Sequence, residues 1–339
     1  MVTSDAPSSS RPVMSGSKID AVLLRRDGTV LGASRVRVKG SEENGGDEHM
    51  LQIVSAVERA CTDAGMSPDR LPVADLGVYC LAGADLPQDD RKIGRWLKRR
   101  GVAARDMVRN DTFAVLRAGT DRRWGVGVVC GYGTNCSAVA PDGRITRFPA
   151  VGEISGDWGG GADIGRMAAW FAVRAEDGRG PATHLRASVP AHFGFKRPRQ
   201  LLEAIYFDRL EPGRLVELAP LVFKEAAGGD AVARDIVDRQ ADEIVLMAGT
   251  AIRRLRMAKL DVHVVLGGGV FRTLDTAFFE RIQEGLGGVA PAAAIKVLTA
   301  PPVIGAALLG LDHLEAGPAA HARARQGLTH HRLSQKTYP

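Results

Sequence analysis

Five short loops, four of them rich in glycine, carry the residues whose types and spacing could do chemistry. Each loop follows an apolar run or precedes a helical one, where exposed backbone N–H groups can hold phosphates and hydroxyl groups. The loops are residues 15–18, 109–112, 130–136, 156–165 and 267–269. A single glycine loop is more often a plain turn than a phosphate cradle, so the prediction of a ligand site depends on the order and spacing of the loops together.

Asp111 is the candidate catalytic residue. It lies in Arg-Asn-Asp-Thr, just before an apolar run at 113–119 that is predicted to be helical. A carboxylate at the start of a helix can cap free backbone N–H groups and then needs no further role. On the floor of a cleft, the same carboxylate could take the proton of a sugar hydroxyl as it attacks a phosphate. The residue type alone leaves both interpretations open.

Residues 130–136, Cys-Gly-Tyr-Gly-Thr-Asn-Cys, could hold a phosphate. Gly131 and Gly133 flank a turn, and Thr134 and Asn135 add a hydroxyl donor and an amide. A hairpin turn without a ligand is the simpler alternative. The two cysteines could suggest an iron–sulfur site, but cysteines on neighbouring strands are more often buried packing residues.

The remaining loops differ in strength. Asp157 lies among the glycines of residues 156–165. Since each ordered glycine costs conformational entropy, we expect a ligand-facing loop in which Asp157 binds sugar hydroxyls. The three glycines at 267–269 suit a turn at the adenosine end of a nucleotide. Residues 15–18, Ser-Gly-Ser-Lys, could hold a terminal phosphate or could be a disordered lead-in to the first strand.

The elements that must position these loops form two sets of the same kind. Residues 20–24 and 29–36 are predicted to be a β-hairpin with an Asp-Gly turn, followed by a helix at 49–65. In the second half, strands on both sides of the Gly-Tyr-Gly turn precede a long helical region at 198–259. A hairpin followed by helices, occurring twice, predicts two α/β domains of related design.

The composition excludes several other classes of protein. The chain has 339 residues, 45% hydrophobic and 25% charged, which suits two globular domains. Its net charge of +6 comes without a recognition helix or finger spacing, so no nucleic-acid partner is expected. Four cysteines without a CxxC pair predict neither a disulfide framework nor a zinc site. Without a spanning apolar run or a secretory signal, a cytoplasmic location is expected.

Together these residues resemble the actin–hexokinase–Hsp70 (ASKHA) superfamily, in its branch of BadF/BadG/BcrA/BcrD-type ATPases and N-acetylglucosamine kinases. The resemblance covers about residues 18 to 314. It is carried, in order, by NDTFAVLRAG, GVVCGYGTNC, ISGDWGGG with AEDGRG downstream, VVLGGGV and PPVIGAALLGLDHL. It implies an α/β fold of two ribonuclease-H-like lobes with ATP and sugar in the cleft between them.

The resemblance also implies a division of the chain. We expect a disordered N-terminal segment at 1–15 and an N-terminal lobe at 16–112. A C-terminal lobe is expected at 113–301, and a helix at 302–314 that returns to the first lobe. The last residues, 317–339, are predicted to be a basic flexible tail.

The implied activity is phosphorylation of an amino sugar, N-acetylglucosamine or glucosamine, with ATP and Mg²⁺ as cofactors. Asp111 matches the general base, and Asn110, Asn135 and Asp157 match positions that contact the sugar. The nucleotide is expected to contact Gly16, Ser17, Lys18, Gly131, Gly133, Thr134, Gly267, Gly268 and Gly269. No residue is assigned as a metal ligand. The expected partners are the sugar and ATP, without nucleic acid or membrane, and the expected assembly is a homodimer.

One segment departs from the family pattern. The first phosphate loop usually reads Asp-Gly-Gly-x-[Ser/Thr]-Lys-Thr-Asp, with an acidic residue that organises Mg²⁺ through water. In the register of residues 17–18, the acidic position falls on Val13, Met14 and Ser15 replace glycines, and the preceding strand falls on residues 9–12. The alternative function is therefore a non-catalytic or weakly active relative that binds sugar or nucleotide. A third hypothesis, a dehydratase activator, needs an iron–sulfur cluster, and only two cysteines lie near a loop.

Overall fold

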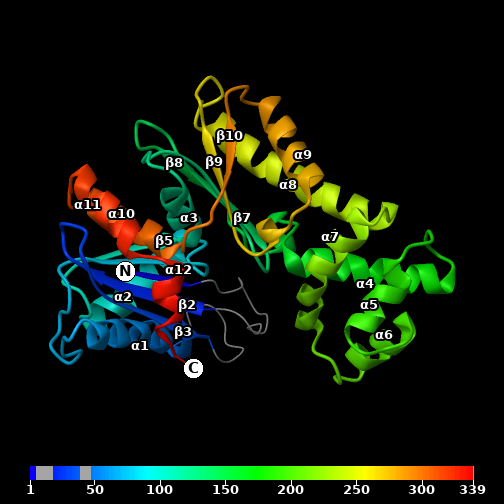
Figure 1. The fold of residues 1–339 in the computed structure, drawn as a ribbon, viewed down its shortest axis with the longest axis horizontal. Coiled ribbons are helices and arrows are strands. Elements are labelled where there is room, and N and C mark those ends of the chain that lie inside the picture. Colours follow the sequence, from blue (N-terminus) through cyan, green and yellow to red (C-terminus); the bar gives the residue numbers. More distant parts are fainter. Residues whose placement is uncertain (5–17, 39–46, 339) are drawn as a thin grey trace.

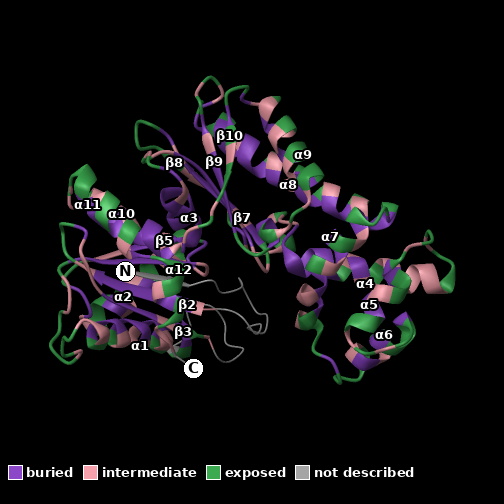
Figure 2. Ribbon diagram, viewed as in Figure 1, coloured by how far each residue is buried: buried purple, intermediate pink, exposed green. Residues whose placement is uncertain are grey.

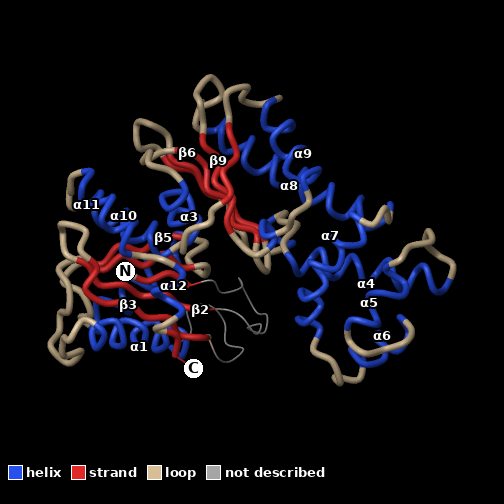
Figure 3. Tube along the Cα trace, viewed as in Figure 1, coloured by secondary structure: helices blue, strands red, loops and turns tan. Residues whose placement is uncertain are grey.

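Residues 1–4, 18–38 and 47–338 are described by the computed structural model, and they fold into two lobes (Figure 1). Each lobe is built around one β-sheet (Figure 3). Buried residues concentrate on the strands and on the helix faces that cover them (Figure 2). The α/β class and the repeated design predicted from the sequence are confirmed.

The first lobe contains a mixed sheet with helices against it. Its elements are β1 (Val2–Ser4), β2 (Lys18–Leu24), β3 (Val30–Arg37), α1 (Asp47–Asp63), β4 (Gly77–Leu81), α2 (Pro87–Arg100) and β5 (Asp106–Asn110). β1 lies inside the sheet, antiparallel to β2 and parallel to β4. Every residue of β4 is buried, as expected for a central strand covered on both faces.

The second lobe has an equivalent sheet and a larger set of helices. Its elements are β6 (Gly125–Cys130), β7 (Thr134–Val139), β8 (Ile145–Arg147), α4 (Gly161–Asp177), α5 (Leu185–His192), α6 (Pro198–Tyr206), η2 (Pro212–Leu218), α7 (Ala219–Ala227), α8 (Ala231–Arg254), β9 (His263–Gly267), α9 (Thr276–Gly287) and β10 (Ala294–Val297). The strand order β10-β9-β6-β7-β8 matches the order β5-β4-β1-β2-β3 of the first lobe. The helices α4 to α7 extend away from the first lobe (Figure 1).

Two helices, α3 (Asp111–Gly119) and α10 (Val303–His313), cross between the lobes. α3 follows the first sheet but packs against β6 and β9 of the second, and α10 follows the second sheet but packs against β4 and β2. The two helices also pack against each other. A Cβ atom on Gly305 would lie 1.8 Å from the carbonyl oxygen of Ala114, so this crossing requires a glycine.

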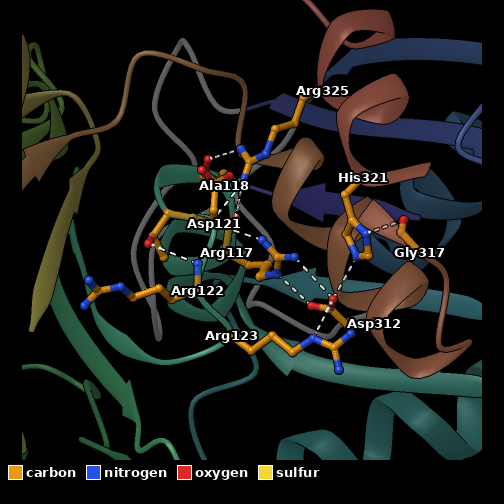
Figure 4. Close-up of polar contacts among 10 residues, drawn as sticks. Arg117, Ala118, Asp121, Arg122, Arg123, Asp312, Gly317, His321 and Arg325 are labelled. Atoms are coloured by element: carbon orange, nitrogen blue, oxygen red, sulfur yellow. Dashed lines mark hydrogen bonds and ion pairs between the residues drawn. The ribbon is translucent and has the colours of Figure 1, made fainter. Parts of the chain in front are cut away.

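The C-terminal residues differ from the predicted basic flexible tail. They form α11 (Pro318–Gly327), α12 (His330–Ser334) and β11 (Thr337–Tyr338), and β11 pairs with the edge strand β3. The guanidinium group of Arg325 donates to the backbone oxygens of Arg117, Ala118 and Thr120 at the end of α3 (Figure 4). The composition did not indicate this order, because Arg325 binds backbone carbonyl oxygens and the acidic partners of Arg323 and Lys336, Asp27 and Asp63, lie far away in the sequence.

The partly buried carboxylate of Asp312 anchors the same region. It pairs with Arg117 at 2.6 Å, with Arg123 at 3.0 Å and with His321 at 2.8 Å (Figure 4). Because these partners come from α3, from the loop after it and from α11, the contacts hold the C-terminal end of α3 in place. The opposite end of α3 begins with Asp111.

The N-terminal residues also differ from the prediction. Val2–Ser4 form β1, whereas the sequence predicted disorder for residues 1–15 and a first strand at residues 20–24. A strand of three residues is too short to show the alternation of apolar and polar residues that marks longer strands. Residues 5–17, including Val13, Gly16 and Ser17, lie outside the described residues.

Candidate active site

Asp111 begins α3 at the carboxyl end of β5. Leu81 of β4 lies opposite Asn110 of β5 in a parallel pair, so the residues after both strands meet at one edge of the sheet. Asn110 is the N-cap of α3, and its side-chain oxygen accepts from the backbone N–H of Thr112 at 3.1 Å. Asp111 is therefore not the cap. It is the first helical residue, it is 6% exposed, and the positive end of the helix dipole favours its negative form.

Hydrogen bonds join the start of α3 to the second lobe. The Thr112 hydroxyl lies 2.6 Å from Asn110 Oδ1 and 2.6 Å from the Ser137 hydroxyl on β7. Asn135, also on β7, donates from Nδ2 to Asn110 Oδ1 at 3.3 Å. The structure thus brings together Asn110 and Asn135, and Asp111 directly follows Asn110 in the chain.

The turn at Gly131–Gly133 connects β6 to β7 and rests on the start of α4. The backbone N–H groups of Gly161 and Ala162 donate to the carbonyl oxygens of Gly131 and Tyr132 at 2.8 and 2.9 Å. A Cβ atom added to Gly131 or Gly133 would meet nothing within 4 Å. Packing therefore does not require these two glycines, and they leave the backbone open to a ligand.

The glycines at 267–269 lie directly beside this turn, because β9 runs parallel to β6. Gly268 has a φ of +113°, and a Cβ atom on it would lie 2.3 Å from the carbonyl oxygen of Cys130. Gly267 packs against Val115 of α3, whereas Gly269 faces open space. The predicted phosphate and adenosine loops therefore adjoin each other.

The glycines of residues 156–165 have a different explanation from the one expected. A Cβ atom on Gly160 would lie 2.4 Å from the carbonyl oxygen of Tyr132, and one on Gly165 would lie 1.8 Å from that of Leu215. Gly160 also has a φ of +83°. Packing against the 131–133 turn and against η2 requires these glycines, so their abundance is not by itself evidence of a ligand.

Asp157 is half-buried in the same segment. Its Oδ2 atom accepts from the backbone N–H of Gly152 at 3.2 Å and bonds to the Ser155 hydroxyl. Its negative charge makes the smallest contribution to the raised pKa of Asp85, after burial and the charges of Asp111 and Asp89, so Asp157 shares the electrostatic environment of the lobe junction.

Asp85 is a residue of this site that the sequence analysis did not identify. It follows β4 and is 6% exposed, and its Oδ1 accepts from Asn110 Nδ2 at 2.9 Å and from Asn135 Nδ2 at 3.3 Å. Burial, followed by the negative charges of Asp111 and Asp89, raises the pKa of Asp85 to about 9. The signal available was an acidic residue directly after a buried apolar strand, in Leu-Ala-Gly-Ala-Asp.

Cys130 and Cys136 are fully buried in the core of the second lobe. Burial raises the pKa of the Cys130 thiol to about 12 and raises that of Cys136 as well. Cys130 Sγ lies 3.3 Å from the Thr134 hydroxyl. Both side chains are therefore packing residues, the simpler of the two interpretations from sequence.

Comparison with known proteins assigns the chain to a family. A model of the BadF/BadG/BcrA/BcrD ATPase family matches residues 15–310. The chain belongs to this family.

No helix within residues 1–4, 18–38 and 47–338 is long and apolar enough to cross a membrane.

Three similar proteins are sugar kinases by name. An N-acetylmuramic acid/N-acetylglucosamine kinase of Clostridium acetobutylicum is 29% identical over 208 residues, or 61% of this chain and 68% of the relative. An N-acetyl-D-glucosamine kinase of Dictyostelium discoideum is 26% identical over 275 residues, or 78% and 83%. The crystal structure of a proposed N-acetylglucosamine kinase from Chromobacterium violaceum has a TM-score of 0.64 at 23% identity, covering 91% and 97% of the two chains. That last likeness shows the two-lobed fold alone.

The position of β1 changes how the first phosphate loop compares with other BadF/BadG/BcrA/BcrD ATPases. The family match begins at residue 15, after β1. Ser4 of β1 pairs with Ile19 of β2, and the next residue in the sequence is Asp5. The chain therefore has an acidic residue directly after its first strand, separated from Lys18 by a longer segment than the family pattern has. Of the predicted loop residues, only Lys18, which begins β2, is described.

Proposed function

We propose that the chain is an ATP-dependent kinase that transfers the terminal phosphoryl group of ATP to a hydroxyl group of an amino sugar. The observation that carries this proposal is the junction of the two sheets. There a buried carboxylate, Asp111, begins a helix whose first turn bonds through Thr112 to Ser137, which lies four residues after the open Gly131–Gly133 turn. A base and a phosphate cradle at one lobe junction suit phosphoryl transfer to an alcohol.

Asp111 acts as the general base. Its buried carboxylate takes the proton of the attacking sugar hydroxyl, which makes that oxygen a better nucleophile. Contacts at both ends of α3 keep the carboxylate in place, since Asn110 caps the start and Arg325 binds the last carbonyls. Asn135 and Asp157 supply amide and carboxylate groups for the other sugar hydroxyls.

The residues of the second lobe fit ATP. Gly131, Gly133 and Gly269 have open space where a side chain would be, so their backbone can approach phosphates closely. Thr134 adds a hydroxyl beside the turn. ATP supplies the phosphoryl group, and the adjoining glycines at 267–269 hold its adenosine end.

Mg²⁺ would enter with the nucleotide. Among the described residues, no group of three or more His, Cys, Asp or Glu could hold a metal ion. A Mg²⁺ ion in such enzymes is typically held by substrate phosphates, waters and one or two carboxylates, so it needs no protein cage. It would neutralise the charge that develops on the phosphates.

The non-catalytic alternative is not favoured. It depended on Val13 occupying the acidic position of the first phosphate loop, but β1 lies at Val2–Ser4 and is followed by Asp5. The similar proteins from Clostridium acetobutylicum and Dictyostelium discoideum are both named as kinases. A homodimer and a cytoplasmic location remain part of the proposal, and sedimentation tests the first.

The experiment is ADP release from Mg-ATP over a panel of hexoses and amino sugars. We expect release to depend on an amino sugar, with N-acetylglucosamine and glucosamine giving the highest kcat/KM. ATP or sugar binding without ADP release on any sugar would instead support the non-catalytic relative.

A further inference from the structure

Asp85 lies where the two lobes meet and does not serve the fold of either lobe alone. Its Oδ1 atom receives hydrogen bonds from Asn110 of the first lobe at 2.9 Å and from Asn135 of the second at 3.3 Å. Both amides also contact each other, since Asn135 Nδ2 lies 3.3 Å from Asn110 Oδ1. The three side chains form a closed triangle directly beside Asp111.

The chain around Asp85 is tied to the second lobe at two further points. Arg147 on β8 donates to the carbonyl oxygen of Ala84 at 3.3 Å and pairs with Asp90 at 2.9 Å. The Asp90 and Arg147 side chains are 29% and 19% exposed, so water screens this pair only in part. The segment from the end of β4 to the first turns of α2 is therefore a bridge between the lobes, and Asp85 is the acidic residue of the loop within it.

We propose that Asp85 is a positioning residue of the active site, whose carboxyl group links Asn110 to Asn135 and sets the spacing of the lobes around Asp111. This proposal rests on the proposed kinase function. The contact to Asn135 is longer than the 2.7–3.2 Å of most hydrogen bonds. Asn135 lies at the same 3.3 Å from Asn110, so closure of the lobes on substrates would shorten both contacts of Asn135.

Whether Asp85 is charged determines how well its carboxyl group can link Asn110 to Asn135. Two carboxylates, Asp85 and Asp111, cannot both ionise in a buried site without repelling each other. The charged groups that face Asp85 are Asp111 on α3, Asp89 on α2, Arg147 on β8 and Asp157 before α4. Three of these four are acidic, and only Arg147 favours ionisation. With its pKa at about 9, Asp85 is uncharged at neutral pH and accepts both amides without opposing Asp111.

The first test compares Asp85→Asn, Asp85→Ala and a surface control in the same lobe, Asp69→Asn. An asparagine keeps the acceptor oxygen, so Asp85→Asn should restore at neutral pH most of the kcat that Asp85→Ala loses. The alanine variant loses the link, so its kcat should fall about tenfold to a hundredfold while the KM for ATP stays unchanged.

In the wild type, kcat should fall as pH rises through about 9 and Asp85 ionises. The asparagine variant should lack this alkaline decline. An alkaline decline that persists in Asp85→Asn, or a wild-type kcat in Asp85→Ala, overturns the proposal.

The second test does not depend on catalysis. A carboxyl group whose folded pKa is raised contributes stability that is present at low pH and is lost as pH rises toward the folded value. Replacing Asp85 by asparagine removes this dependence. The melting temperature of Asp85→Asn should therefore exceed that of the wild type by a margin that grows from pH 5 to pH 9. A constant margin would mean that Asp85 is ionised in the folded protein, which overturns the proposal even if no sugar is phosphorylated. A growing margin without any sugar kinase activity would instead contradict the proposed function alone.

Discussion

The two lobes share one strand order but carry different residues at the same edge of their sheets. In the first lobe, the carboxyl ends of β4 and β5 lead to Asp85, Asn110 and Asp111, side chains that accept hydrogen bonds or hold protons. In the second lobe, the carboxyl ends of β6 and β9 lead to Gly131, Gly133 and Gly269, which leave their backbone open instead. In our account the first lobe handles the proton of the sugar and the second the phosphates of ATP. The residues at the strand ends, rather than the shared fold, therefore determine which chemistry each lobe can carry out.

The largest effect on activity is expected in the first lobe, at Asp111. Asp111→Asn keeps the shape of the side chain but cannot take a proton, so kcat should fall about 10³-fold with little change in either KM. ADP release measures this, with Asp69→Asn as the matched surface control. A variant with wild-type kcat would mean that Asp111 of the first lobe is not the base, which contradicts the proposed division of chemical roles between the lobes.

Changes in the glycine turns of the second lobe should affect nucleotide binding. Gly133→Ala adds a methyl group that meets no protein atom within 4 Å, so the melting temperature should stay at the wild-type value. The methyl group would stand in the path of a phosphate, and the KM for ATP should rise about tenfold, or about 1.4 kcal/mol.

A matched variant separates ligand-facing glycines from packing glycines. Gly160→Ala places a Cβ atom 2.4 Å from a carbonyl oxygen at a φ of +83°. It should lower the free energy of unfolding by about 2 kcal/mol. Equal effects of the two variants on melting temperature and on KM would contradict the distinction drawn between these glycines.

The first hairpins of the two sheets differ most in their connections. Residues 131–133 join β6 to β7, whereas residues 5–17 join β1 to β2. Deleting residues 6–13 leaves Asp5-Met-Ser-Gly-Ser-Lys18, the family spacing from acid to lysine. The deletion should raise kcat/KM for ATP severalfold, and Asp5→Asn should abolish that gain. If Val13→Asp with Met14→Gly raises the rate in the full chain and the deletion does not, the acidic position belongs to residue 13.

The smallest effect is expected away from the cleft. Arg325→Ala removes the hydrogen bonds to the last carbonyls of α3, which should lower the free energy of unfolding by about 2 kcal/mol. The KM for ATP should not change, because Arg325 contacts neither glycine turn. Thermal unfolding and ADP release check the two parts, and a raised KM for ATP would show that α3 transmits strain to the second lobe.

The sequence predicts contiguous features well and distant contacts poorly. The two-lobed α/β fold and the family follow from motifs that are unbroken in the chain, such as Asn-Asp-Thr and Gly-Tyr-Gly. Asp85 was missed because its partner Asn135 lies fifty residues away, in the other lobe. β1 was missed because residues 5–17 separate it from Lys18. The C-terminal helices were missed because Arg325 binds backbone carbonyl oxygens. Every residue has such an oxygen, so the residue types do not indicate this contact.

The most direct test of the central claim follows the phosphoryl group itself. Purified protein is incubated with ATP labelled in the terminal phosphate, with Mg²⁺ and with N-acetylglucosamine or glucosamine, and the labelled products are separated. Our account predicts label on a hydroxyl group of an amino sugar in the wild type and almost none in Asp111→Asn. Label that appears only as inorganic phosphate, or that stays in ATP with every amino sugar, would contradict it.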